Sequence, residues 1–120
     1  MSEYLADTYA FIEIIRGNTN YQRYATAQLR TTQHQLAELL YWAIRKENTQ
    51  ARTLVFRLWK YTASLSASTM FFAMKLKHKH RKNKLSYADC IGYATAAQLE
   101  IPFLTGDEQF KDMPNVEFVK

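Results

Sequence analysis

The chain has 120 residues, of which 48% are hydrophobic and 14% aromatic, and its formal net charge is +5 at pH 7. This composition excludes a disordered chain, and the length fits one domain spanning residues 1–120. No apolar run approaches the roughly 18 residues of a membrane span, and the first residues lack a signal-peptide pattern, so we expect a cytoplasmic protein that does not enter a membrane. The single cysteine, Cys90, excludes an internal disulfide, and we expect it to pack in the core.

The first half of the chain alternates compact apolar runs with segments of helical periodicity. Residues 4–6 predict a buried strand that ends at Asp7. Residues 9–16 are apolar nearly all round, which predicts a buried helix capped by Gly17. The segments predicted after it are a short helix around 21–25, a strand at 28–31, a helix at 32–46 opened by a capping box of Thr32 and Gln35, and a helix from about 49.

The second half of the chain repeats this alternation. Residues 62–68 are ambiguous between a short strand and a loop. A helix is predicted over 69–82, apolar first and basic after, and a further helix follows a capping box of Ser86 and Asp89. The last predicted elements are a strand at 101–104, the turn 105–107, a short helical turn including Phe110, and a strand at 116–119.

Strands that alternate with helices predict an α/β domain with a mainly parallel sheet and helices on both faces. We therefore expect a three-layer α/β/α sandwich whose central sheet has four to five short strands. In such sheets, ligands bind outside the carboxyl ends of the strands, so that edge is the first place to look for a site.

Four acidic residues lie where these elements end or begin. Asp7 ends the first predicted strand and Asp107 follows the strand at 101–104, whereas Glu38 and Asp89 lie in the first two turns of predicted helices. Because strand ends and the starts of the following helices share one edge of a parallel sheet, we expect all four side chains to meet there. Carboxylates this close repel one another unless a hard divalent cation such as Mg²⁺ or Mn²⁺ neutralises them.

Each acid also has an alternative interpretation that needs no metal. Asp7 could cap the first helix, and Asp89 could serve only in the capping box. Glu38 could face solvent, and Asp107 could be a turn residue beside Gly106. Only their joint placement at one edge favours a site.

The excess positive charge is concentrated between residues 75 and 84. Six of the 16 Lys and Arg residues lie there without an acidic neighbour, and the remaining basic residues nearly balance the 11 acidic ones. A run of this kind suits a polyanion such as RNA, because binding releases counterions condensed on the phosphates, although a solvated helix end is the alternative. The residues of this basic run are Lys75, Lys77, Lys79, Arg81, Lys82 and Lys84.

Four segments together resemble the PIN-domain family of metal-dependent ribonucleases. The apolar strand 4–6 followed by Asp7-Thr8 resembles the first family motif, and residues 36–39, with Glu38, resemble the second. Residues 86–94, which begin Ser-Tyr-Ala-Asp, resemble the third, and residues 101–107, which end Thr-Gly-Asp, resemble the fourth. The ending 115–119 is similar to a common last strand of the family.

The resemblance implies a metal-dependent endoribonuclease and assigns roles to residues of this chain. Asp7, Asp89 and Asp107 would hold one or two Mg²⁺ or Mn²⁺ ions, with Glu38 as a further ligand that orients the attacking water. Two neighbouring hydroxyl residues, Thr8 and Thr105, would hydrogen-bond these carboxylates. Many small members resemble VapC-type toxins, which are homodimers held inactive by an antitoxin, so an antitoxin partner and a homodimer are implied as well.

Two other classes of function stay open at this point. A non-catalytic PIN-like module would bind RNA or protein, and the complete set of acids argues against it. A metal-dependent phosphatase with a strand-end Asp nucleophile usually carries Asp-x-Asp, whereas the position two beyond Asp7 is Tyr9.

Overall fold

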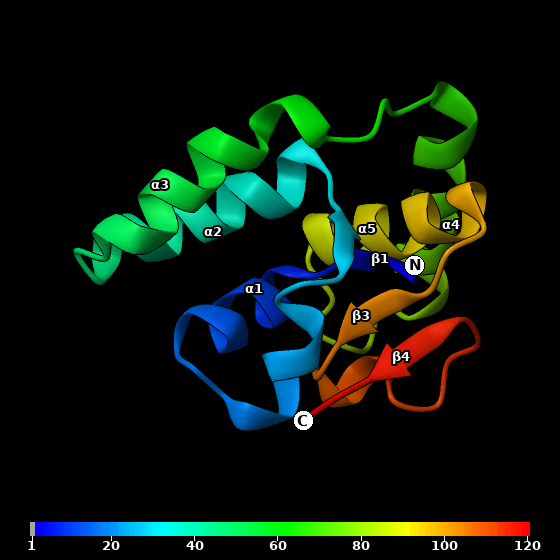
Figure 1. Cartoon of the computed structure of the whole chain (residues 1–120). Coiled ribbons are helices and arrows are strands. Elements are labelled where there is room, and N and C mark those ends of the chain that lie inside the picture. Colours follow the sequence, from blue (N-terminus) through cyan, green and yellow to red (C-terminus); the bar gives the residue numbers. More distant parts are fainter. Residues whose placement is uncertain (1) are drawn as a thin grey trace.

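In the computed structural model, which describes residues 2–120, short strands alternate with helices along the whole chain (Figure 1). The predicted α/β class and mainly parallel sheet are therefore confirmed. In chain order the elements are β1 (Glu3–Ala6), α1 (Thr8–Ile15), the 3₁₀ helix η1 (Thr19–Tyr24), β2 (Gln28–Arg30), α2 (Gln33–Arg45), α3 (Thr49–Leu58), η2 (Trp59–Tyr61), α4 (Ala67–Lys79), α5 (Tyr87–Leu99), β3 (Phe103–Thr105), η3 (Glu108–Phe110) and β4 (Val116–Phe118).

The sheet described in residues 2–120 has four strands in the order β2-β1-β3-β4. Every neighbouring pair runs parallel, with Leu5 of β1 opposite Phe103 of β3 and Leu104 opposite Glu117 of β4. Parallel neighbours need crossover connections, and the helices supply them. All four carboxyl ends therefore meet at one edge, although the strands come from opposite ends of the sequence.

Two hydrophobic cores lie on the two faces of this sheet, because side chains alternate along each strand. Leu5 and Phe103 face the core formed with α4 and α5. Ala6 and Leu104 face the core formed with α1, α2 and α3. Figure 1 shows the two groups of helices on either side, with α2 and α3 side by side as a hairpin. The three-layer α/β/α architecture is thus confirmed, and the predicted packing role of Cys90 agrees with its full burial.

Some boundaries differ from the sequence prediction for identifiable reasons. Helix α4 begins at Ala67, not 69, because Ser66 accepts a hydrogen bond from the Thr69 backbone and caps it. It ends at Lys79, not 82, one turn after Leu76, which is the last apolar residue of the helix. Strand β3 lies at 103–105 instead of 101–104, and Pro102 before it has no N–H to donate to a ladder.

The ambiguous segment 62–68 contains no strand in the structure. Thr62 makes one isolated parallel bridge to Thr31, and the Ala63 amide donates to the Thr31 carbonyl at 2.9 Å. The residues after this bridge are a loop that leads into α4. Within residues 2–120, no helix combines the length and the apolar character needed to cross a membrane.

Candidate functional site

Asp7 lies at the junction of β1 and α1, where the first strand ends inside the molecule. Its side chain is only 2% exposed and caps α1 by accepting a hydrogen bond from the Thr8 amide at 2.9 Å. Its other oxygen accepts a hydrogen bond from the Thr105 hydroxyl of β3 at 2.8 Å. The helix-capping alternative is therefore correct, but it leaves each carboxylate oxygen with a further lone pair.

Glu38 lies in the second turn of α2 and is held from two sides. The Thr8 hydroxyl donates to its Oε1 at 3.0 Å, and the Ser86 hydroxyl donates to its Oε2 at 3.1 Å. The side chain is only partly exposed. The solvent-facing alternative for Glu38 is therefore wrong, because two hydroxyls from α1 and from the start of α5 turn its carboxylate toward the sheet edge.

Asp89 lies in the first turn of α5 and forms the predicted capping box with Ser86. Its Oδ2 accepts a hydrogen bond from the Ser86 amide at 2.8 Å, and its own amide donates to the Ser86 hydroxyl at 3.0 Å. That same hydroxyl donates to Glu38. Ser86, which the sequence suggested only as a cap, thus links two of the acids, and the spacing of its motif gave no sign of this second contact.

Asp107 follows β3 and is tied to the same network through Thr105. The Thr105 hydroxyl accepts a hydrogen bond from the Asp107 amide at 3.1 Å while it donates to Asp7. The Asp107 carboxylate caps η3 by accepting from the Gln109 amide at 3.0 Å. The turn alternative is thus correct as well, and this turn brings the fourth acid to the edge that carries the other three.

The electrostatics of the edge agree with this proximity. Burial, together with the charges of Asp89 and Glu38, raises the pKa of Asp7 to about 8, although the hydrogen bonds from Thr105 and Thr8 act to lower it. Burial also raises the pKa of Asp89 to about 6, with contributions from Glu38 and Asp107. Each acid therefore interacts with at least one other, and Asp7 and Asp89 resist being ionised at the same time.

A buried amide fixes the distance between the helices that carry Glu38 and Asp89. The Gln35 side chain is fully buried and donates to the Ala88 carbonyl at 2.6 Å, so it bridges α2 and α5. Gly92 makes this possible, since an added Cβ would lie 2.0 Å from the Gln35 nitrogen. The predicted capping box of Thr32 and Gln35 is incomplete: Thr32 caps α2, and the Gln35 side chain bonds the Thr32 hydroxyl and α5 but not the Thr32 backbone.

The four acids are neighbours, but they do not form a ready-made set of metal ligands. Within residues 2–120, no three Asp, Glu, His or Cys side chains lie close enough together to enclose an ion. Hydroxyl and amide donors instead keep the carboxylates in place. The donor chemistry still fits a hard divalent cation, because all four groups offer carboxylate oxygens and their mutual repulsion would be relieved by positive charge.

The basic run borders this edge. Lys75, Lys77 and Lys79 lie on the last turns of α4, and the other three residues lie in the loop that leads to α5. The Lys84 backbone amide donates a hydrogen bond to the side-chain oxygen of Gln109 at 2.8 Å. The backbone amide of Gln109 in turn donates to the Asp107 carboxylate. The loop is therefore attached to the turn that carries one of the acids, which brings the positive and negative surfaces together.

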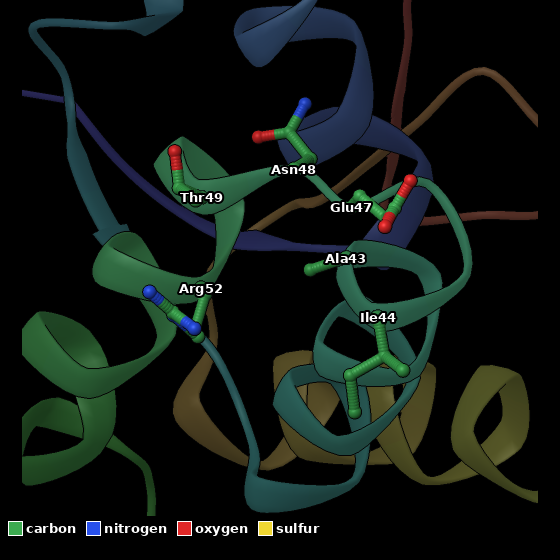
Figure 2. A pocket seen from close by; sticks show the side chains of 6 residues that line it. All are labelled: Ala43, Ile44, Glu47, Asn48, Thr49 and Arg52. Atoms are coloured by element: carbon green, nitrogen blue, oxygen red, sulfur yellow. The ribbon is translucent and has the colours of Figure 1, made fainter.

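A separate pocket lies away from the acids, at the turn between α2 and α3. Figure 2 shows that Ala43 and Ile44, at the end of α2, and Thr49 and Arg52, at the start of α3, line it. Its α2 residues lie about one and a half turns beyond Glu38. The hollow therefore does not belong to the acidic edge.

The parallel sheet, its two helical layers and the acids at its carboxyl edge define a three-layer α/β/α domain with an acidic site. A family model described as the PIN domain matches residues 4–116. The chain belongs to the PIN-domain family, as its motifs predicted. A comparison with curated proteins found no match.

Solved structures with a similar fold cover nearly the whole chain. Mycobacterium tuberculosis VapC20, a sarcin-ricin loop cleaving toxin, gives a TM-score of 0.78 at 18% identity over 99% of this chain and 100% of that one. A toxin-antitoxin complex from Klebsiella pneumoniae gives 0.74 at 20% identity over 94% of each chain. VapBC2 from Rickettsia felis, bound to a DNA fragment from its promoter, gives 0.69 at 18% identity over 98% and 99%.

Proposed function

We propose that this protein is an endoribonuclease that hydrolyses RNA phosphodiester bonds with the help of Mg²⁺ or Mn²⁺. The observation that carries the proposal is the linkage of the four acids. Asp7, Glu38, Asp89 and Asp107 come from four separate segments, yet Thr8, Ser86 and Thr105 join them at one sheet edge. Ser86 and Thr105 do so through their hydroxyls, and Thr8 through its hydroxyl and its backbone amide. Family membership and the similarity to an RNA-cleaving toxin support the same reading.

The metal would be held by Asp7, Asp89 and Asp107, with Glu38 as a further ligand or as the group that orients water. When bound, such an ion lowers the pKa of a coordinated water and offsets the charge that develops on the phosphate. Its binding would also favour the ionised forms of Asp7 and Asp89, whose pKa values are raised by burial and by neighbouring acids.

The chain's own residues would contribute position and charge. Thr8 and Ser86 hold the Glu38 carboxylate from two sides, which restricts its rotation and leaves its remaining lone pairs for water. Thr105 holds Asp7 and the turn of Asp107 at a fixed spacing. The six residues of the basic run would bind the RNA backbone without reading its sequence, because ammonium and guanidinium groups recognise phosphate.

Protein partners form part of the proposal. Two similar structures are described as toxin-antitoxin or VapBC assemblies, which supports an antitoxin that inhibits this chain. Large apolar side chains on α2 and α3 are exposed, among them Ile44 at 65% and Phe56 at 73%. Exposed apolar residues of this size are suited to protein contacts, either with an antitoxin or within a homodimer. We place the protein in the cytoplasm, where its RNA substrate is found.

A cleavage assay with metal titration tests the activity. The purified protein should cut single-stranded or structured RNA, lose activity with a chelator and regain it with Mn²⁺ or Mg²⁺. Asp89→Asn should reduce the rate by more than about a hundredfold, whereas Asp112→Asn, a change at an exposed acid outside the network, should leave it unchanged. Cleavage by a folded Asp89→Asn variant at the normal rate would refute the proposal. Tight RNA binding without cleavage would favour a non-catalytic module.

A further inference from the structure

A second pocket lies in the basic run itself, between the end of α4, the following loop and the start of α5. Its volume is about 320 Å³, in the range of small ligand sites. The polar residues that line it are Lys77, His78, His80, Arg81, Asn83 and Tyr87. This lining combines cations, imidazoles and an amide with one aromatic ring, which is the mixture that proteins present to a nucleotide.

Tyr87 is the unusual member of this lining. It is the first residue of α5, and 64% of it is exposed although it is a large aromatic residue. The Lys77 ammonium lies 4.7 Å from the centre of its ring and also donates to the Leu85 carbonyl at 2.7 Å. The lysine is thus anchored on two sides and helps to orient the ring, whose remaining surface is open to solvent.

The pocket is also next to the acids. Tyr87 directly follows Ser86, whose hydroxyl bonds Glu38, and it precedes Asp89 by two residues. The side chains of Tyr87 and Asp89 point to different faces of α5 because they are two residues apart, so a group held by Tyr87 would lie one helical turn or less from the acids but not among them. If an RNA strand crosses the acidic edge, a nucleotide next to the one at the acids would therefore reach the pocket.

We propose that this pocket binds one unpaired nucleotide of the RNA substrate, with its base stacked on Tyr87 and its phosphate contacting Lys77 and Arg81. The inference rests on the proposed function, since it takes RNA as the ligand. Stacking on a side chain requires a base that is free of the helical stack, so the pocket favours single-stranded over double-stranded RNA. Stacking on a tyrosine ring does not depend on base identity, so sequence preference is not expected from this contact.

The chain supplies a matched control for the aromatic contact. Tyr41 on α2 is 65% exposed, and the Arg45 guanidinium lies 5.2 Å from the centre of its ring. It thus repeats the exposure and the cationic neighbour of Tyr87 but does not line the pocket. If an exposed tyrosine next to a cation were enough to bind RNA, changes at the two positions would have the same effect.

The test measures binding of a short fluorescein-labelled RNA by anisotropy, in EDTA so that cleavage does not interfere. For the single strand, Tyr87→Ala should weaken binding about 5- to 150-fold, the range found for loss of one base–aromatic stack. Tyr87→Phe and Tyr41→Ala should each stay within about twofold of the wild type. For the same RNA as a duplex, Tyr87→Ala should change little. Thermal unfolding of each variant establishes that it is folded.

The salt dependence separates stacking from charge. Tyr87→Ala should leave the slope of log K against log salt unchanged, whereas Lys77→Met should reduce it by about one. An unchanged affinity of Tyr87→Ala for the single strand, or an equal loss for the duplex, would overturn the inference. If the wild type cleaves RNA but Tyr87→Ala binds RNA as tightly as the wild type, the nucleotide pocket is refuted and the proposed activity stands. Tyr87-dependent binding without any cleavage would remove the proposed activity and leave the nucleotide pocket in place.

Discussion

Asp7→Asn should make the metal-free protein more stable at neutral pH, although it removes a group that we place in the active site. The folded protein holds the Asp7 pKa at about 8, against the ordinary 3.8, through burial and the charges of Asp89 and Glu38. Between these two pH values the folded state retains a proton that the unfolded state releases. Stability therefore falls as the pH rises from about 4 towards 8.

The magnitude follows from the same pKa difference. At pH 7, the need to keep Asp7 protonated in the folded state lowers the free energy of unfolding by about 4 kcal/mol. This follows because pH 7 is about three units above the ordinary pKa and each unit corresponds to about 1.36 kcal/mol. An asparagine keeps an oxygen that can accept from the Thr8 amide but disturbs the bond from the Thr105 hydroxyl, which costs about 1–2 kcal/mol. We expect a net gain of about 2 kcal/mol, or a rise in Tm of about 5–10 °C.

Urea unfolding in EDTA at several pH values measures this effect. The stability difference between Asp7→Asn and the wild type should shrink towards pH 4 and grow towards pH 8. Millimolar Mn²⁺ should stabilise the wild type more than the variant, because the variant has lost one carboxylate ligand. Asp112→Asn, at an exposed position, should stay within about 0.5 kcal/mol of the wild type. The reasoning is refuted if Asp7→Asn is less stable than the wild type at pH 7, or if both show the same pH dependence.

Three further changes test the hydrogen bonds and the packing around the acids. Ser86→Ala should cost about 1 kcal/mol in urea unfolding through the lost helix cap and lower the cleavage rate by releasing Glu38; an unchanged rate would show that this contact is unimportant. Gly106→Ala should cost about 1–3 kcal/mol, because an added Cβ would lie 2.3 Å from the Tyr9 ring. An unfolding midpoint equal to that of the wild type would contradict this packing. Gln35→Met should cost about 1–3 kcal/mol by removing the bridge between α2 and α5, and calorimetry that finds no loss would argue against the bridge.

The sequence predicted the fold well because its signals are local and agree with one another. The apolar run at 4–6 and the capping box of Ser86 and Asp89 each point to one element, and both elements are present. The helix end near 80 could not be predicted, because lysine has good helix propensity and the basic run continues past the last apolar anchor. The segment 62–68 was ambiguous because its single bridge, at Thr62, depends on a partner 31 residues earlier in the chain.

The site was predictable in part, for a related reason. The rule that parallel strands share one carboxyl edge was enough to gather Asp7 and Asp107. It could not show that one hydroxyl, that of Ser86, contacts both Glu38 and Asp89, because this contact depends on the side-chain rotamers of two helices. The role of Gln35 was missed in the same way: its side chain fits a capping box in sequence, and only the close approach of α5 at Gly92 gives its nitrogen a second partner, the Ala88 carbonyl.

The claim that the four acids form one metal site is tested most directly by Mn²⁺ binding, followed by electron paramagnetic resonance. Substitution of each acid in turn by its amide (Asp7→Asn, Glu38→Gln, Asp89→Asn and Asp107→Asn) should weaken the binding of Mn²⁺ by more than about tenfold, with Asp112→Asn as the unaffected control. If the wild type binds no Mn²⁺, or if the four variants bind it as tightly as the wild type, the acids do not form the metal site that we propose.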